Sequence, residues 1–259
     1  MVNKLTFLGT AGDYLVLSKQ TRYSGGIAIE CDDLSLILNP GPGSLVLAKQ
    51  MGVQLRDFDA ILATDTTFLH SHDVGAVASA LTHGGLDSRG VVVTYKEPPQ
   101  LSESLKNNLE RLIVLPDQGH VALNDVDIRL TTTGKPHLSG VFIRAPKFHV
   151  SFVGDTAFSK SIAKQHQSTE ILLLSVTIVE PDGISCSVDD AISYIQAIKP
   201  KVAVLCEYGQ KVLNQDLLEL VRFIQKETKV HTIAAKDGLV LNPVEHAATV
   251  RQQKLHLGE

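Results

Sequence analysis

Apolar residues recur along the chain in two kinds of pattern, one typical of strands and one typical of helices, and together they predict a regular succession of strands and helices. Short apolar runs bounded by glycine, proline or aspartate are typical of strands. They lie at residues 4–8, 25–30, 34–38, 59–63, 90–95, 126–131, 140–145, 150–153, 171–176, 202–206, 230–235 and 239–241. Asp32 and Asp33 separate the second run from the third, so these two runs predict a β-hairpin.

Helical patterns fill several of the intervals between these strands. They cover residues 44–51, 73–81, 97–111, 188–198 and 216–227. Asp189 and Asp190 begin the fourth of these helices, where the helix dipole favours acidic side chains. Because no low-complexity linker interrupts the pattern, we expect one α/β domain over 1–259, with its core at about 4–241 and a polar tail at about 243–259. The mixture of hairpins and βα units predicts two sheets with helices outside them.

Composition and charge narrow the class of protein. The chain has 259 residues, of which 44% are hydrophobic, and a formal net charge of -4, values typical of a globular protein with a sizeable core. The weak acidity gives no electrostatic reason to expect a nucleic acid or an anionic membrane as partner. No leader pattern or membrane-length apolar run is visible, and the three cysteines form no CxxC pair. We therefore expect a cytoplasmic protein in a reducing compartment.

The loops that follow the predicted strands carry the unusual residues. Between the strand at 59–63 and the next helix stand Asp65, His70, His72 and Asp73. Imidazole and carboxylate groups in such loops ligate zinc, manganese or iron. Polar capping of the helix at Asp73 explains the same residues equally well.

Four further residues are candidates for the chemistry of a site. His137 stands in a loop, and Asp155 directly follows the strand at 150–153. Glu207 ends a buried strand, so a buried carboxylate there needs a partner. Cys186 is either a soft metal ligand or an inert core thiol. The glycine-rich run at 41–44 lacks the full phosphate-loop pattern, which argues against nucleotide binding.

Several segments, taken in chain order, indicate a family. They are LGTAG at 8–12, SGG at 24–26, NPGPGSLV at 39–46, FDAILAT at 58–64, GDT at 154–156, the run 199–209 and AAKDG at 234–238. In this order they resemble the metal-dependent hydrolases of the metallo-β-lactamase superfamily. The resemblance covers about residues 4–241 and implies a four-layer αββα sandwich of two mixed β-sheets flanked by helices. It also implies a metal site along one edge of the sandwich.

The resemblance assigns positions to the ligands of this metal site. The family motif HxHxDH, aligned after Thr64, places Asp65, Thr67, Leu69 and His70 at its four ligand positions. Only the last of the four retains the family's residue. Leucine cannot ligate a metal, and threonine is a poor ligand for zinc. The resemblance therefore implies a degenerate motif.

The remaining ligand positions fall later in the chain. By the same resemblance, His137 matches the third histidine of the first metal site, Asp155 the bridging aspartate, and Glu207 replaces the last histidine. The metal-ligand set that this implies is His70, His137, Asp155, Glu207 and Asp65. It holds one Zn, Mn or Fe ion, or none.

The sequence is compatible with three hypotheses about function. In the first, the fold is kept and the metal chemistry is lost or weakened, so that the protein is a pseudoenzyme that binds a small-molecule ligand or partners an active paralogue. In the second, a rebuilt mononuclear site hydrolyses a phosphodiester or another ester. In the third, the same cleft binds a small anion without a metal. The substrate and the oligomeric state stay open as well.

Overall fold

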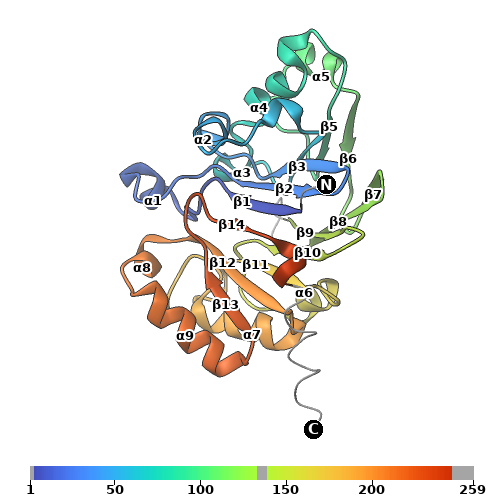
Figure 1. Ribbon diagram of the computed structural model, residues 1–259. Helices are drawn as coiled ribbons and strands as arrows, with labels where there is room; N and C mark the ends of the chain where they lie inside the picture. Colours follow the sequence, from blue (N-terminus) through green and yellow to red (C-terminus); the bar gives the residue numbers. More distant parts are fainter. Residues whose placement is uncertain (1–2, 133–138, 247–259) are drawn as a thin grey trace.

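Two seven-stranded sheets stack face to face in the computed structural model, which describes residues 3–132 and 139–246. Helices cover the outer face of each sheet, so the layers run helix, sheet, sheet, helix (Figure 1). This arrangement confirms the α/β class that the sequence pattern predicts and the αββα sandwich that the family resemblance implies.

The first sheet contains mostly N-terminal strands and one strand from the C-terminal part of the chain. Strands β14, β1, β2 and β3 are antiparallel neighbours, and β3 to β6 are parallel. The β2–β3 pair is the predicted hairpin. In sheet order the strands are β14 (Val240–Leu241), β1 (Lys4–Phe7), β2 (Ile27–Cys31), β3 (Leu34–Leu38), β4 (Ala60–Ala63), β5 (Val91–Thr94) and β6 (Arg111–Val114).

The second sheet contains the seven strands between residues 120 and 234. Strands β10 to β13 are parallel neighbours, whereas β7 to β10 form an antiparallel meander. In sheet order they are β13 (His231–Ala234), β12 (Val202–Tyr208), β11 (Ile171–Val176), β10 (His149–Val153), β9 (Ser139–Arg144), β8 (Val126–Thr132) and β7 (His120–Leu123).

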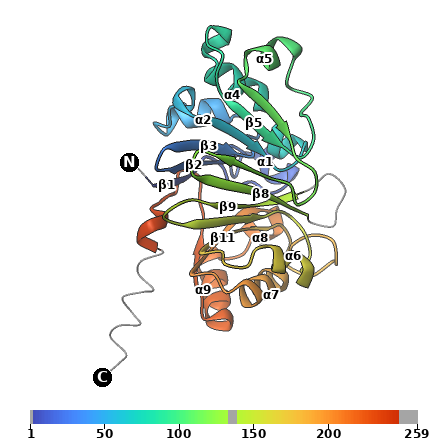
Figure 2. The ribbon, with the colours of Figure 1, turned by 90° about the vertical axis from the view of Figure 1, so that its right-hand side faces the viewer.

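Helices close the two outer layers (Figure 2). On the side of the first sheet are α1 (Tyr14–Lys19), α2 (Ser44–Gln50), α3 (Phe68–Ser71), α4 (Val74–Leu81) and α5 (Glu103–Asn108); on the side of the second are α6 (Lys160–Gln165), α7 (Val188–Ile198), α8 (Gln210–Leu213) and α9 (Leu217–Thr228). Two 3₁₀ turns lie at Leu55–Asp57 and His83–Gly85. The predicted acidic start of α7 is a capping box between Ser187 and Asp190. Among the described helices, none has the length and apolarity of a membrane span.

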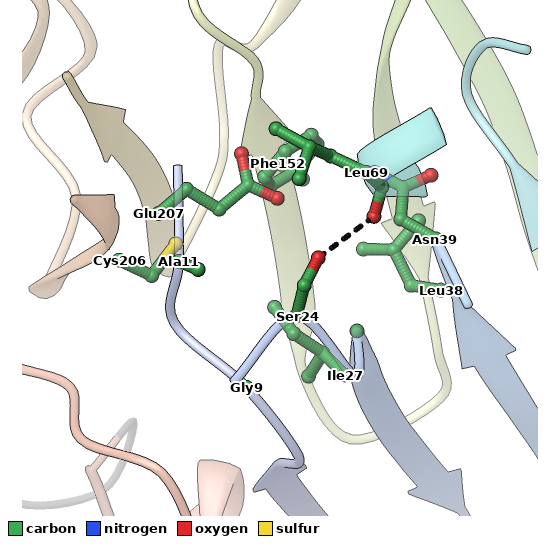
Figure 3. A pocket seen from close by; sticks show the side chains of 11 residues that line it. Gly9, Ala11, Ser24, Ile27, Leu38, Asn39, Leu69, Phe152, Cys206 and Glu207 are labelled. Atoms are coloured by element: carbon green, nitrogen blue, oxygen red, sulfur yellow. Dashed lines mark hydrogen bonds between the residues drawn. The ribbon is translucent and has the colours of Figure 1, made fainter. Parts of the chain in front are cut away.

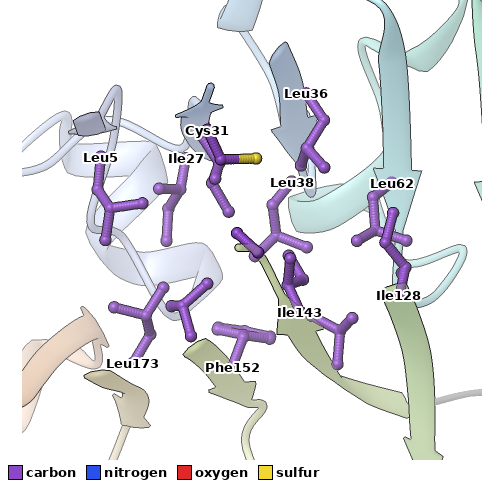
Figure 4. Close-up of a cluster of buried hydrophobic side chains, with 14 of the residues drawn as sticks. Leu5, Ile27, Cys31, Leu36, Leu38, Leu62, Ile128, Ile143, Phe152 and Leu173 are labelled. Carbon is purple, nitrogen blue, oxygen red and sulfur yellow. The ribbon is translucent and has the colours of Figure 1, made fainter. Parts of the chain in front are cut away.

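The central core lies between the two sheets. Leu38 and Leu62 of the first sheet face Ile143 and Phe152 of the second (Figure 4). Successive residues of a strand point to opposite faces, so Ile37 packs on the other side, beneath α2 and α4. Strands buried on both faces read as continuous apolar runs, which is why the sequence signals them clearly.

The region after β5 differs from its prediction. A helix over 97–111 is wrong, because α5 covers only Glu103–Asn108 and β6 follows it. Ser102 caps the helix by accepting a hydrogen bond from the Leu105 amide. The chain turns extended at Leu109, and β6 pairs with β5 as the edge of the sheet. The sequence pattern also does not predict β7, α1, α3, α6 and α8, which are all short.

Candidate functional site

Loops from the first sheet lock together at one edge of the sandwich. Asn39, after β3, accepts hydrogen bonds at its Oδ1 from both the amide and the hydroxyl of Thr64, each at 2.9 Å. The Ser24 hydroxyl donates to the Leu69 carbonyl at 3.2 Å (Figure 3). A Cβ on Gly41 would lie 2.0 Å from that same carbonyl oxygen, so only glycine allows the loops to approach this closely. The loop that carries the predicted metal motif is therefore held by its neighbours.

Glu207 reaches the same edge from the second sheet. The pairing of β11 with β12 shifts register so that Ser175 faces Cys206 and the next pair skips Glu207, which is thus a bulged residue. Its φ of 49° lies in the left-handed region, which is uncommon for a residue other than glycine or asparagine. The bulge turns the carboxylate into the pocket (Figure 3).

His70 connects the two sheets at this edge. Its Nδ1 lies 2.5 Å from Oδ2 of Asp65, and its Nε2 lies 3.1 Å from Oε1 of Glu207. The other oxygen of Glu207 accepts a hydrogen bond from the Ser175 hydroxyl. The side chains of Asp65, His70 and Glu207 are 1%, 13% and 13% exposed, respectively. Asp65 and His70 belong to the loop after β4, whereas Glu207 belongs to β12, so this triad spans the sandwich.

The imidazole and the carboxylates of the triad stabilise one another's charged forms. Burial opposes a charge on His70, but the carboxylates of Asp65 and Glu207 outweigh it and raise the pKa of the imidazole well above its usual value. Burial also opposes ionisation of Asp65, yet the charge of His70 and hydrogen bonds from His70 and Thr67 hold the pKa of that carboxyl below its usual range. The geometry is therefore that of an imidazolium held between two carboxylates.

Asp155 anchors the segment between β11 and α7. Its Oδ1 accepts hydrogen bonds from the Thr177 hydroxyl at 2.5 Å and from the Cys186 amide at 2.8 Å. Both donors belong to the segment that joins β11 to α7. The Cys186 side chain itself is buried among the core residues beneath α7, as an inert core thiol is.

The other sequence candidates have different positions. His137 lies outside the described residues. Asp73 precedes α4, but its side chain makes no capping hydrogen bond there and lies 2.9 Å from Nδ1 of the half-exposed His72. Capping by Asp73 is therefore wrong as an explanation of this segment. Within 3–132 and 139–246, no group of three or more His, Cys, Asp or Glu side chains is arranged to hold a metal ion.

A small cavity of about 10 Å³ lies beside the triad. Its lining includes Glu207, Asn39 and the apolar side chains of Leu69 and Phe152 (Figure 3). This volume admits about one water molecule. The sequence gives no sign that Ser175 is the second partner of Glu207, because this serine stands inside an otherwise apolar run typical of a buried strand.

The comparison with known families agrees with this architecture. Residues 35–207 match the family described as the beta-lactamase superfamily domain. An uncharacterized protein of Methanocaldococcus jannaschii is 23% identical over 251 residues, which cover 91% of this chain and 93% of that protein.

Solved structures share the fold over nearly the whole chain. The metallo-beta-lactamase fold protein YhfI from Bacillus subtilis has a TM-score of 0.77 at 14% identity, covering 92% of this chain and 98% of its own. Zn(2+)-bound PqqB from Methylobacterium extorquens has a TM-score of 0.70 at 13% identity, covering 92% of this chain and 99% of its own. At these identities the likeness shows a common fold.

Proposed function

Because the chain belongs to the beta-lactamase superfamily, we propose that it is a member in which an ion pair takes the place of the metal centre, and that it acts by binding rather than by metal-dependent hydrolysis. The observation that carries this proposal is the position of His70, with a carboxylate oxygen at each ring nitrogen. An imidazolium that donates both of its N–H groups keeps no lone pair for a metal ion.

The donor set supports the same conclusion. A catalytic zinc takes about three protein ligands plus water, and a structural zinc about four. The family resemblance assigns two of these ligand positions to Leu69 and Thr67, which supply no donor and a poor donor, respectively. Leu69 instead lines the small cavity beside Glu207. The described residues therefore do not fit a zinc centre of the kind found in the family.

The triad can perform two structural roles of a metal ion, namely compensating carboxylate charges and linking the two sheets. A cation between carboxylates offsets their mutual repulsion, and the charge of His70 does so for Asp65 and Glu207. It also joins a loop of the first sheet to a strand of the second. The cavity beside it has a volume of about 10 Å³, which is room for about one water molecule. This edge is thus suited to hold the fold together rather than to activate a nucleophile.

A protein of this kind functions by binding another molecule rather than by catalysis. The occupant that we propose is a small-molecule ligand or an active relative of the same family, and a dimer of this chain is compatible with both. The three cysteines, all free and buried, favour a reducing compartment such as the cytoplasm.

Elemental analysis of tag-free protein tests the proposal directly. The protein is equilibrated with zinc, manganese or iron, freed of loose metal, and assayed for metal content and for hydrolysis of bis(p-nitrophenyl) phosphate. We expect well under one metal ion per chain and no turnover above buffer. A variant that restores the family motif, with Asp65→His, Thr67→His, Leu69→Asp and Glu207→His, is the matched positive control, and we expect it to retain zinc.

One result would reverse the conclusion. A tightly held metal ion in the unmodified chain, lost together with hydrolysis in His70→Ala, would mean that a rebuilt mononuclear hydrolase site is the correct reading. If the restored variant does not fold, the comparison of the unmodified chain with His70→Ala still decides between the two.

A further inference from the structure

A groove of about 330 Å³ lies among the helices outside the second sheet, and no residue of the triad lines it. The segment after β11, the start of α7, α8 and the first half of α9 surround it. Its apolar lining includes Val188, Val212, Leu220 and Phe223. Phe223 is 48% exposed, although a phenylalanine on the outer face of a helix gains nothing from contact with water. The groove is at the lower end of the size range of ligand pockets.

Carboxylates surround this apolar lining. Glu180 comes from the segment after β11, Asp189 from α7, and Asp216 and Glu219 from the start of α9. Among the residues that the structure describes, none of the four takes part in an ion pair, and no lysine or arginine lines the groove. An apolar surface with an unpaired acidic rim is complementary to a chain that carries basic side chains around an apolar one.

We propose that this groove docks a basic amphipathic peptide segment of a partner protein. An apolar side chain of the segment packs on Phe223 and Leu220, and flanking lysine or arginine side chains pair with the carboxylates of the rim. The half-exposed position of Phe223 favours a peptide laid across the groove, because a small molecule is usually buried over most of its surface. A hydrolase and a binding protein are equally able to carry such a surface, so docking at this groove does not depend on whether the triad holds a metal ion.

The helix dipole alone does not account for this surface. Acidic residues at a helix N-terminus stabilise the helix, which explains Asp189, Asp216 and Glu219 without any partner. Glu180 belongs to no helix, and the exposure of Phe223 owes nothing to the dipole. These two residues therefore separate a docking role from a capping role, and the test uses them.

Fluorescence anisotropy with labelled synthetic peptides provides the test. The probe is a short amphipathic helix of leucine and lysine; a leucine–glutamate analogue and a serine–lysine analogue report on charge and on apolar contact separately. We expect the leucine–lysine peptide to bind and the two analogues not to bind. The Kd of the leucine–lysine peptide should rise as the salt concentration rises. Phe223→Ser should weaken it about tenfold, as expected for loss of an apolar anchor, and Glu180→Gln about threefold at low salt.

Matched variants outside the groove control for non-specific attraction. Leu86, on the side of the first sheet, is 88% exposed, and Asp117 is an exposed acid in the turn that joins β6 to β7. Leu86→Ser and Asp117→Asn should leave the Kd unchanged, and a thermal melt of each variant confirms that it is folded. Equal binding by Phe223→Ser and the unmodified chain would overturn the proposal, as would equal weakening by Leu86→Ser. A concentration-dependent dimer that Phe223→Ser abolishes would assign the groove to a second copy of the chain and overturn it too.

Discussion

Replacement of His70 by alanine removes the cation that the carboxylates of Asp65 and Glu207 share. At 3.1 Å and an effective dielectric constant of about 20, a unit charge pair attracts by about 5 kcal/mol, and desolvation offsets much of this. The net cost follows from what is left behind, namely Asp65 at 1% exposure and Glu207 at 13%, without their partner. Breaking a buried pair in this way costs about 3–5 kcal/mol. That is a large part of the roughly 5–15 kcal/mol that stabilises a typical domain.

Two companion variants separate charge from packing. Glu207→Gln keeps a hydrogen-bond acceptor for His70 and loses one charge, so it should cost about 1–2 kcal/mol. The triple variant Asp65→Asn, His70→Gln, Glu207→Gln removes every charge at once. Since no carboxylate is then left unpaired, it should be more stable than His70→Ala alone.

Urea unfolding at neutral pH, followed by circular dichroism, measures these differences. The m-value must stay constant for the midpoints to report on stability. A cost below about 1 kcal/mol for His70→Ala would refute the reasoning, because it would mean that the carboxylates do not depend on the imidazolium. A midpoint of the unmodified chain that falls on addition of a zinc chelator would refute it as well.

Three further predictions concern His166, Gly12 and Asp155, which all lie outside the strands. Burial lowers the pKa of His166 to about 3, so folding excludes a proton that the unfolded chain binds below about pH 6.5. The free energy of unfolding therefore falls as the pH falls. Between pH 7 and 5, urea titrations should show that the unmodified chain loses about 2 kcal/mol more of this free energy than His166→Gln does. Equal losses would contradict this explanation. Gly12→Ala places a Cβ 1.9 Å from the Glu207 carbonyl oxygen and should cost about 1–3 kcal/mol in the same assay, whereas a neutral effect would mean that the loop after β1 moves away from β12 easily. Asp155→Ala should speed proteolytic cleavage within residues 178–185, and Asp155→Asn, which keeps an acceptor for the Cys186 amide, should not; identical digestion patterns would exclude the anchoring role.

The predictable part of the fold is the part where each strand is buried on both faces. All six residues of Ile171–Val176 are buried, and the apolar run in the sequence marks the strand almost to its ends. Arg111–Val114 gave no such signal, because β6 is an edge strand with its first and last residues exposed. Its conformation depends on pairing with β5, which a local pattern does not contain.

The sequence predicts the members of the triad but not their contacts. Asp65, His70 and Glu207 are all candidate site residues in the sequence, and the family resemblance assigns them as metal ligands. Whether they ligate a metal stays a prediction that the metal analysis tests. Their direct pairing depends on the bulge at Glu207, which arises from the register between β11 and β12. That register is a property of two strands together, so no window of the sequence contains it.

The pairing of β14 with β1 also affects how the chain folds during its synthesis. Strand β14 is the red strand beside the blue β1 in Figure 1, with Leu241 opposite Leu5. The N-terminal half leaves the ribosome first, yet one edge of β1 has no partner until residues 240–241 have also emerged. An open strand edge is a template for pairing with other chains. The nascent protein therefore passes through a period in which its first sheet is open to aggregation, and a slow translation step late in the chain would lengthen that period.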